Sequence, residues 1–133
     1  MIEREKLIAV ANSYLQQGLL EHKPQEVLFA DHCVRYEMGY QTGGNAKQLR
    51  ELLSSDSYKS NKAIHDKQWV VEAPWLDVRF TLELHNIEQT MRVATRFKIV
   101  DGLIEHIEIL FNAGPLQQII VDSNQVLRTD IES

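Results

Sequence analysis

The spacing of hydrophobic residues changes near residue 63, from a helical period to a period of two. Before that point, residues 2–17 carry apolar side chains three and four positions apart, which predicts an amphipathic helix. A second helix is predicted over residues 24–30, because Pro24 suits the first turn of a helix. A third is predicted to begin after Asn45, with Gln48 in the reciprocal capping position.

After residue 63, apolar and polar residues alternate, which predicts strands with one buried face. The strands are expected over residues 64–72, 76–85, 89–100 and 103–112. Ala73 and Pro74 separate the first two, and Asp101-Gly102 is a strong hairpin signal between the last two. A short strand is also expected over residues 33–38, with loops over residues 41–44 and 54–62.

This order of elements predicts a single α+β domain spanning residues 1–133. Its three N-terminal helices are expected to pack on a strongly curved antiparallel β-sheet, because each strand has one apolar and one charged face. Residues 116–133 fit either a short helix or a strand followed by a frayed tail, and both interpretations stay open.

Composition limits the classes of partner and compartment. The 133 residues carry a net charge of −5, which disfavours binding to a nucleic-acid backbone. A single cysteine, Cys33, fits a reducing compartment. The N-terminal residues do not resemble a signal peptide, and no run of about 18 apolar residues occurs. We therefore expect a cytoplasmic protein that does not associate with membranes.

Three stretches are similar to motifs of one superfamily: residues 27–31 (VLFAD), residues 42–52 (TGGNAKQLREL) and residues 96–108 (RFKIVDGLIEHIE). In this order and spacing they resemble the nuclear transport factor 2 superfamily, which includes ketosteroid isomerases and SnoaL-like cyclases. The resemblance covers roughly residues 5–113. It implies a cone-shaped fold with a pocket between helices and sheet, and a homodimer formed through the outer sheet face.

The same resemblance indicates two candidate catalytic residues. Glu37 follows the FAD motif at the spacing of the catalytic aspartate of ketosteroid isomerases, and Tyr14 lies on the apolar face of the first helix. A carboxylate in an apolar cavity is a general-base candidate, and a phenol can stabilise an oxyanion. Strand alternation argues against this, because an inward-facing Tyr36 places Glu37 outside. Which of the two faces the pocket stays open.

His65 is a third candidate, because dehydratases of the superfamily carry a histidine in about this region. Thr95 falls near the position of the protonated aspartate of the isomerases and cannot replace it as a strong donor, which argues against steroid isomerisation. The residues expected to line the substrate pocket are Tyr36, Trp69, Thr95, Phe97 and Phe111. No histidine has convincing metal-ligand spacing, so neither a metal nor a cofactor is expected.

Two functions stay open from the sequence. One is an enzyme of the isomerase, cyclase or dehydratase type that transfers a proton on a small apolar substrate. The other is a non-catalytic module that binds a small apolar molecule or forms a dimer. Trafficking-adaptor activity is disfavoured because no feature marks a partner surface. The fold alone does not distinguish these functions.

Overall fold

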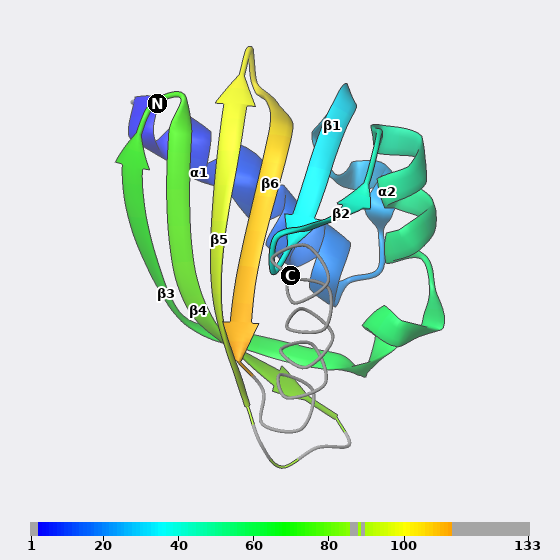
Figure 1. The fold of residues 1–133 in the computed structure, drawn as a ribbon. Coiled ribbons are helices and arrows are strands. Elements are labelled where there is room, and N and C mark those ends of the chain that lie inside the picture. The colour runs from blue at the N-terminus through cyan, green and yellow to red at the C-terminus, as the bar shows by residue number, and fades with distance from the viewer. Residues whose placement is uncertain (1–2, 86–87, 89, 113–133) are drawn as a thin grey trace, which may run out of the picture.

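The computed structural model describes residues 3–85, 88 and 90–112, and its element order is α+β (Figure 1). The helical elements are α1 (Glu3–Ser13), the π-helix η1 (Tyr14–Leu20), the 3₁₀-helix η2 (Pro24–Glu26), α2 (Ala46–Leu53) and the 3₁₀-helix η3 (Asp56–Ser60). The strands are β1 (Phe29–Glu37), β2 (Tyr40–Gly43), β3 (Asn61–Glu72), β4 (Trp75–Leu84), β5 (Met91–Val100) and β6 (Leu103–Asn112).

The strands form one six-stranded mixed sheet in the order β2-β1-β6-β5-β4-β3. The prediction of an antiparallel sheet is wrong for one pair, since β1 runs parallel to β6 while the other neighbouring pairs are antiparallel. A parallel pair needs a long crossover. Here the chain between β1 and β6 forms α2 and the rest of the sheet before it returns to β1.

The predicted apolar faces of the strands form the core. In β4 the alternating residues Leu76, Val78, Phe80, Leu82 and Leu84 are buried. Val93, Phe97 and Ile99 of β5 are buried on the same side, and α1 crosses this face of the sheet behind the strands in Figure 1. In β3 a register shift between His65 and Gln68 accompanies Asp66 at φ 57°. Such a bulge bends a strand, and β3 and β4 curve along their length in Figure 1.

The prediction of three helices needs correction. The described residues contain two α-helices, and the helix expected over residues 24–30 is a single 3₁₀ turn. Its apolar end was misread because Phe29 and Ala30 already belong to β1, where Phe29 pairs with Ile104 of β6. The first helix continues beyond residue 17 as a π-helix, with the backbone N–H of Glu21 donating to the carbonyl of Gln16.

Residues 41–44 were expected to be a loop, but Tyr40–Gly43 form β2 and pair with the end of β1. Gly43 is required where this strand meets α2, because a Cβ atom there would lie 2.2 Å from Cδ2 of Leu49. Backbone and side chain can approach this closely only at glycine. The predicted loop over residues 54–62 contains η3 and the start of β3.

Two local sequence signals are confirmed, the helix cap at Asn45 and the hairpin turn at Asp101-Gly102. The side chain of Asn45 accepts a hydrogen bond from the backbone N–H of Gln48 and caps α2. The side chain of Gln48 accepts instead from the N–H of Gly44, one residue earlier than expected. At the hairpin between β5 and β6, Asp101 and Gly102 both have positive φ, at 52° and 76°, as this turn requires.

The interpretation of residues 116–133 lies outside the described residues. Among the described residues, no helix is long and apolar enough to cross a membrane.

Candidate functional site

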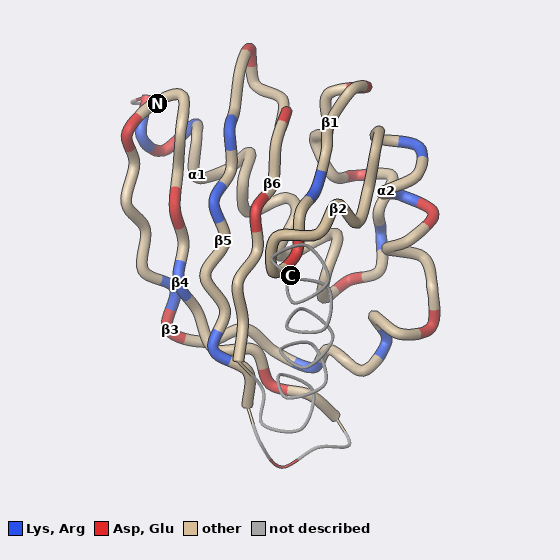
Figure 2. Tube along the Cα trace, in the orientation of Figure 1, with Lys and Arg blue, Asp and Glu red and all other residues tan. Residues whose placement is uncertain are grey.

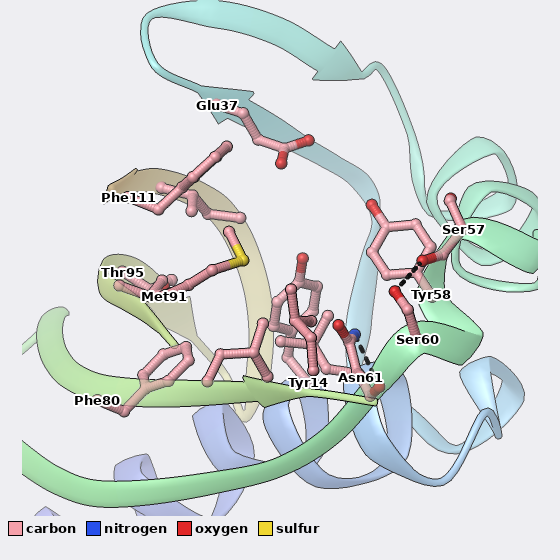
Figure 3. Close-up of a pocket in the computed structure, with 15 residues that line it drawn as sticks. Tyr14, Glu37, Ser57, Tyr58, Ser60, Asn61, Phe80, Met91, Thr95 and Phe111 are labelled. Carbon is pink, nitrogen blue, oxygen red and sulfur yellow. Dashed lines mark hydrogen bonds between the residues drawn. The ribbon is translucent and has the colours of Figure 1, made fainter. Parts of the chain in front are cut away.

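A cavity of about 250 Å³ opens between the inner face of the sheet, η1 and η3 (Figure 3). Most of its wall is apolar, with side chains from β4, β5 and β6. Its polar members come from β1, η1, η3, β3 and β5. The complete lining is Tyr14, Leu19, Glu37, Ser57, Tyr58, Ser60, Asn61, Phe80, Leu82, Leu84, Met91, Val93, Thr95, Ile109 and Phe111. An apolar cavity with a few polar groups is typical of a small-molecule site.

The two faces of β1 are opposite to those expected from hydrophobicity. Cys33 and Arg35 are buried on the inner side, and Glu37 lines the cavity. Tyr36 points the other way and lines a hollow on the outer face. The more polar set of β1 side chains can face inward because the buried Arg35 has partners for its charge.

Arg35 is the central residue of this site, and the sequence analysis did not identify it. Its side chain is only 2% exposed. One terminal nitrogen donates to the hydroxyl of Tyr14 at 3.1 Å, and the other lies 3.2 Å from a carboxylate oxygen of Glu37. The Nε atom donates to the hydroxyl of Thr42 at 3.1 Å. A buried charge is tolerated only when it is paired and hydrogen-bonded in this way.

Tyr14 is the first residue of the π-helix, and its hydroxyl points into the cavity (Figure 3). Burial raises the pKa of Tyr14 well above its ordinary value, although the charge of Arg35 acts in the opposite direction. The phenol is therefore neutral at physiological pH. Since its oxygen accepts from Arg35, its hydrogen is the group it can offer to a ligand.

The burial of Tyr14 predicts loss of stability at high pH. Tyrosine ionises near pH 10 in the unfolded chain, but the folded state keeps the proton beyond that point. The folded state then binds more protons, so the free energy of unfolding falls as the pH rises above about 10. Denaturant unfolding between about pH 9 and pH 11 should show this fall, and it should be smaller in Tyr14→Phe. Equal pH dependence in both proteins would contradict the assignment.

Glu37 reaches the cavity from the end of β1, across from Tyr14 (Figure 3). Both side chains interact with the terminal nitrogens of the same guanidinium, so Arg35 fixes them relative to one another. Tyr58 of η3 lies beside this group, with its ring 5.9 Å from the guanidinium carbon of Arg35. Burial raises the pKa of Tyr58 as well, so a second neutral phenol borders the cavity.

His65 does not belong to the cavity, which corrects the expectation of a third catalytic member. Its ring lies on the exposed side of β3, 2.8 Å from a carboxylate oxygen of Glu83. Lys62 lies 2.9 Å from the other oxygen of Glu83. The three residues form a surface charge cluster. The position of His65 follows from strand parity, because its cross-strand partner Thr81 faces outward in β4.

The predicted pocket residues divide into two groups. Thr95 and Phe111 line the cavity. Tyr36, Trp69 and Phe97 do not, which corrects the expectation for these three. Phe97 is fully buried beneath the cavity, with its ring 5.8 Å from that of Tyr14, and Trp69 packs against the edge of the core.

The site offers hydrogen-bond donors and acceptors but no set of metal ligands. Among the described residues, no group of three His, Cys, Asp or Glu side chains is placed to hold a metal ion. Cys33 is buried two residues before Arg35 in β1, and burial raises the pKa of its thiol to about 12. A thiol of this kind is not a nucleophile at neutral pH.

Charged residues of both signs occur along the central strands of the sheet (Figure 2). Arg96 of β5 forms an ion pair with Asp77 of β4 at 2.9 Å and lies over the ring of Trp75. Two aliphatic side chains on the outer face of the sheet are unusually exposed, Leu110 at 59% and Val70 at 58%. This face therefore mixes ion pairs with exposed apolar groups.

Solved structures show the class to which this fold belongs. A nuclear transport factor 2-like protein of unknown function from Burkholderia xenovorans matches with a TM-score of 0.70 and 13% identity, over 84% of this chain and 87% of that one. An epoxide hydrolase from Mycobacterium tuberculosis matches with a TM-score of 0.67 and 16% identity, over 81% of this chain and 84% of that one. SalBIII, described as an epoxide hydrolase/cyclase-like enzyme, matches with a TM-score of 0.68 and 15% identity, over 84% of this chain and 95% of that one. The chain has the nuclear transport factor 2-like fold.

The sequence identifies the family more narrowly. Residues 2–111 match the family described as "Domain of unknown function (DUF8021)", and the chain belongs to that family. A search of curated proteins found no match.

Proposed function

We propose that the chain is an enzyme that transfers a proton on a small, largely apolar substrate, with Glu37 as the general base and Tyr14 as the hydrogen-bond donor. The observation that carries the proposal is the position of a carboxylate and a neutral phenol across one apolar cavity, both fixed by Arg35. A positioned base and an oxyanion donor are the two groups that enolisation requires.

The proposed reaction begins with a substrate that carries a carbonyl and an adjacent C–H bond. Glu37 removes the proton from this carbon, and the C–H electron pair moves into the new C=C bond as the carbonyl becomes an enolate. The Tyr14 hydroxyl donates a hydrogen bond to the enolate oxygen. In a β,γ-unsaturated ketone, return of the proton from Glu37 to the far end of the dienolate gives isomerisation. In a β-hydroxy ketone, the enolate electron pair expels the β-hydroxyl, which takes the proton from Glu37 and leaves as water.

The cavity limits the size of the substrate. An apolar cavity of about 150 Å³ holds one benzene molecule. The 250 Å³ cavity therefore suits a molecule of one or two rings rather than a four-ring steroid. Thr95 adds no carboxylic acid beside the oxyanion, which is a second reason to disfavour steroid isomerisation.

Proton transfer can be measured without knowledge of the natural substrate. The protein is incubated in D₂O with small ketones, including the bicyclic ketone α-tetralone, and deuterium entry next to the carbonyl is followed by NMR. We expect faster exchange than in buffer with at least one compact ketone. Absence of acceleration across the panel would contradict the proposal.

A non-catalytic binding module is the second candidate. It is favoured by the ion pair between Glu37 and Arg35, because a substrate C–H group must compete with the guanidinium for the same carboxylate. In that case the ketones bind but do not exchange, so the same experiment separates the two functions.

We also propose a homodimer through the outer face of the sheet. Exposed Leu110 and Val70 lie on this face together with charges of both signs, which suits a self-complementary two-fold contact. Light scattering at micromolar concentration should give twice the chain mass, and Leu110→Glu should lower it. A monomer mass for the unsubstituted protein would contradict the proposal.

A further inference from the structure

The wall of the cavity at the start of β3 has a second polar feature, the side chain of Asn61. Its amide nitrogen donates to the backbone carbonyl of Leu19 at 3.1 Å. A carbonyl oxygen can only accept, so this contact fixes which end of the carboxamide is nitrogen and which is oxygen. The Oδ1 atom is the end turned toward the cavity in Figure 3.

Asn61 Oδ1 accepts no hydrogen bond from the part of the chain that the structure describes. Across residues 3–85, 88 and 90–112, the structure shows one hydrogen bond from the amide nitrogen of Asn61 and none to its oxygen. Among the η3 side chains that line the cavity, Ser60 donates to the carbonyl of Ser57, the Ser57 hydroxyl pairs with Ser55, and Tyr58 lies against Arg35. Asn61 is therefore the residue at this edge that presents a fixed acceptor to a ligand.

Tyr14 presents the complementary group. Its oxygen accepts from Arg35, and its hydrogen remains for an acceptor on the ligand. The cavity thus offers a donor at Tyr14 and an acceptor at Asn61, with the apolar side chains of Phe80, Leu82 and Met91 in the same wall. A ligand that satisfies both groups carries an acceptor oxygen, a hydroxyl and an apolar body.

We propose that the cavity binds a compact, largely apolar hydroxy ketone, with its carbonyl oxygen on Tyr14 and its hydroxyl donating to Asn61 Oδ1. The inference rests on the proposed function, because it names the ligand class of the same cavity. Selection for the hydroxyl follows from desolvation: a ligand without it leaves the Asn61 oxygen covered by an apolar group and deprived of water.

The test compares matched ligands by isothermal titration calorimetry. The probes are α-tetralone, its derivatives hydroxylated at each position of the aromatic ring, and the corresponding methoxy compounds. We expect at least one hydroxytetralone to bind about three- to ten-fold more tightly than both α-tetralone and its methoxy analogue, the range that one hydrogen bond contributes. The methoxy compound has similar size but cannot donate, so it controls for added surface.

Variants assign the preference to a residue. Asn61→Leu should bring the ratio between hydroxy and unsubstituted ligand to about one, while Ser54→Ala, which lies outside the cavity lining, should leave it unchanged. Tyr14→Phe should weaken every tetralone by a similar factor and keep the ratio. Side-chain amide NMR of the unsubstituted protein provides a second readout, because the Asn61 amide signals should shift with the hydroxy ligand and not with its methoxy analogue.

The proposal is overturned if no hydroxytetralone is preferred, if none binds at millimolar concentration, or if the preference survives in folded Asn61→Leu. A preference that disappears in Glu37→Gln but not in Asn61→Leu would assign the hydroxyl to Glu37 and also overturn it. These measurements need no turnover, so their failure leaves proton transfer by Glu37 standing. If deuterium exchange into ketones is not accelerated but the preference for a hydroxytetralone is intact, proton transfer by Glu37 is contradicted and the ligand assignment stands.

Discussion

Glu37→Gln should lower the rate of ketone deuterium exchange by about 10²–10⁴-fold, the range that a positioned general base contributes. Glutamine has the shape of glutamate and can still accept from Arg35, but it cannot take up a proton. The substitution therefore tests the base without emptying the cavity. Its effect should fall on the rate constant of the bound ketone, with the dissociation constant almost unchanged.

The matched control for this variant is Glu108→Gln. Glu108 is an exposed carboxylate of β6 that pairs with His106 on the other face of the sheet. Glu108→Gln should catalyse ketone deuterium exchange at the same rate as the unsubstituted protein. If Glu37→Gln retains more than about a tenth of the rate, Glu37 is not the base, and the binding-module interpretation takes precedence.

Arg35→Met should lower the free energy of unfolding by about 3 kcal/mol, as is usual when one member of a buried charge pair is removed. Methionine fills the space of the aliphatic stem but offers no donor to Tyr14, Thr42 or Glu37. Glu37 then loses its counter-charge at the cavity wall. Urea unfolding followed by circular dichroism measures the change.

Two further variants make the result specific. Arg35→Lys keeps the positive charge but loses the planar set of guanidinium donors. It should therefore lower the free energy of unfolding measurably, but by less than Arg35→Met does. Arg79→Met removes an exposed arginine from the outer face of β4 and should change stability by less than about 0.5 kcal/mol. A loss below about 1 kcal/mol for Arg35→Met would show that the buried network does not hold the site together.

The sequence predicted those parts of the fold that depend on local pattern. The strict alternation from Leu76 to Leu84 identifies β4 and its buried face, because a period of two allows no other regular structure. The predicted helix over residues 24–30 was wrong because Phe29 pairs with Ile104 of β6, a partner more than seventy residues away that no local pattern contains. The parallel pairing was missed for the same reason.

For the candidate site, motif spacing led to Tyr14 and Glu37, and the structure places both on one cavity. It could not lead to Arg35, since an arginine on a strand is ordinarily exposed, and its burial depends on a partner in the first helical segment, Tyr14, which lies 21 residues earlier in the chain. Asn61 was missed because it falls in a stretch expected to be loop. The outward position of His65 could have been read from the alternation of β3, had the bulge at Asp66 been known.

The pairing of β1 with β6 determines when the proposed site can form during folding. Arg35 and Glu37 stand opposite Ile107 and Ile109, so the strand that carries the proposed base joins the main sheet only through the last described strand. Such distant contacts must overcome a large loop-closure entropy and form late. We expect nascent chains that stop before residue 103 to lack an assembled site, whereas the β3–β4 hairpin needs only its own sequence. The proposed catalytic site would then be assembled only once β6 pairs with β1.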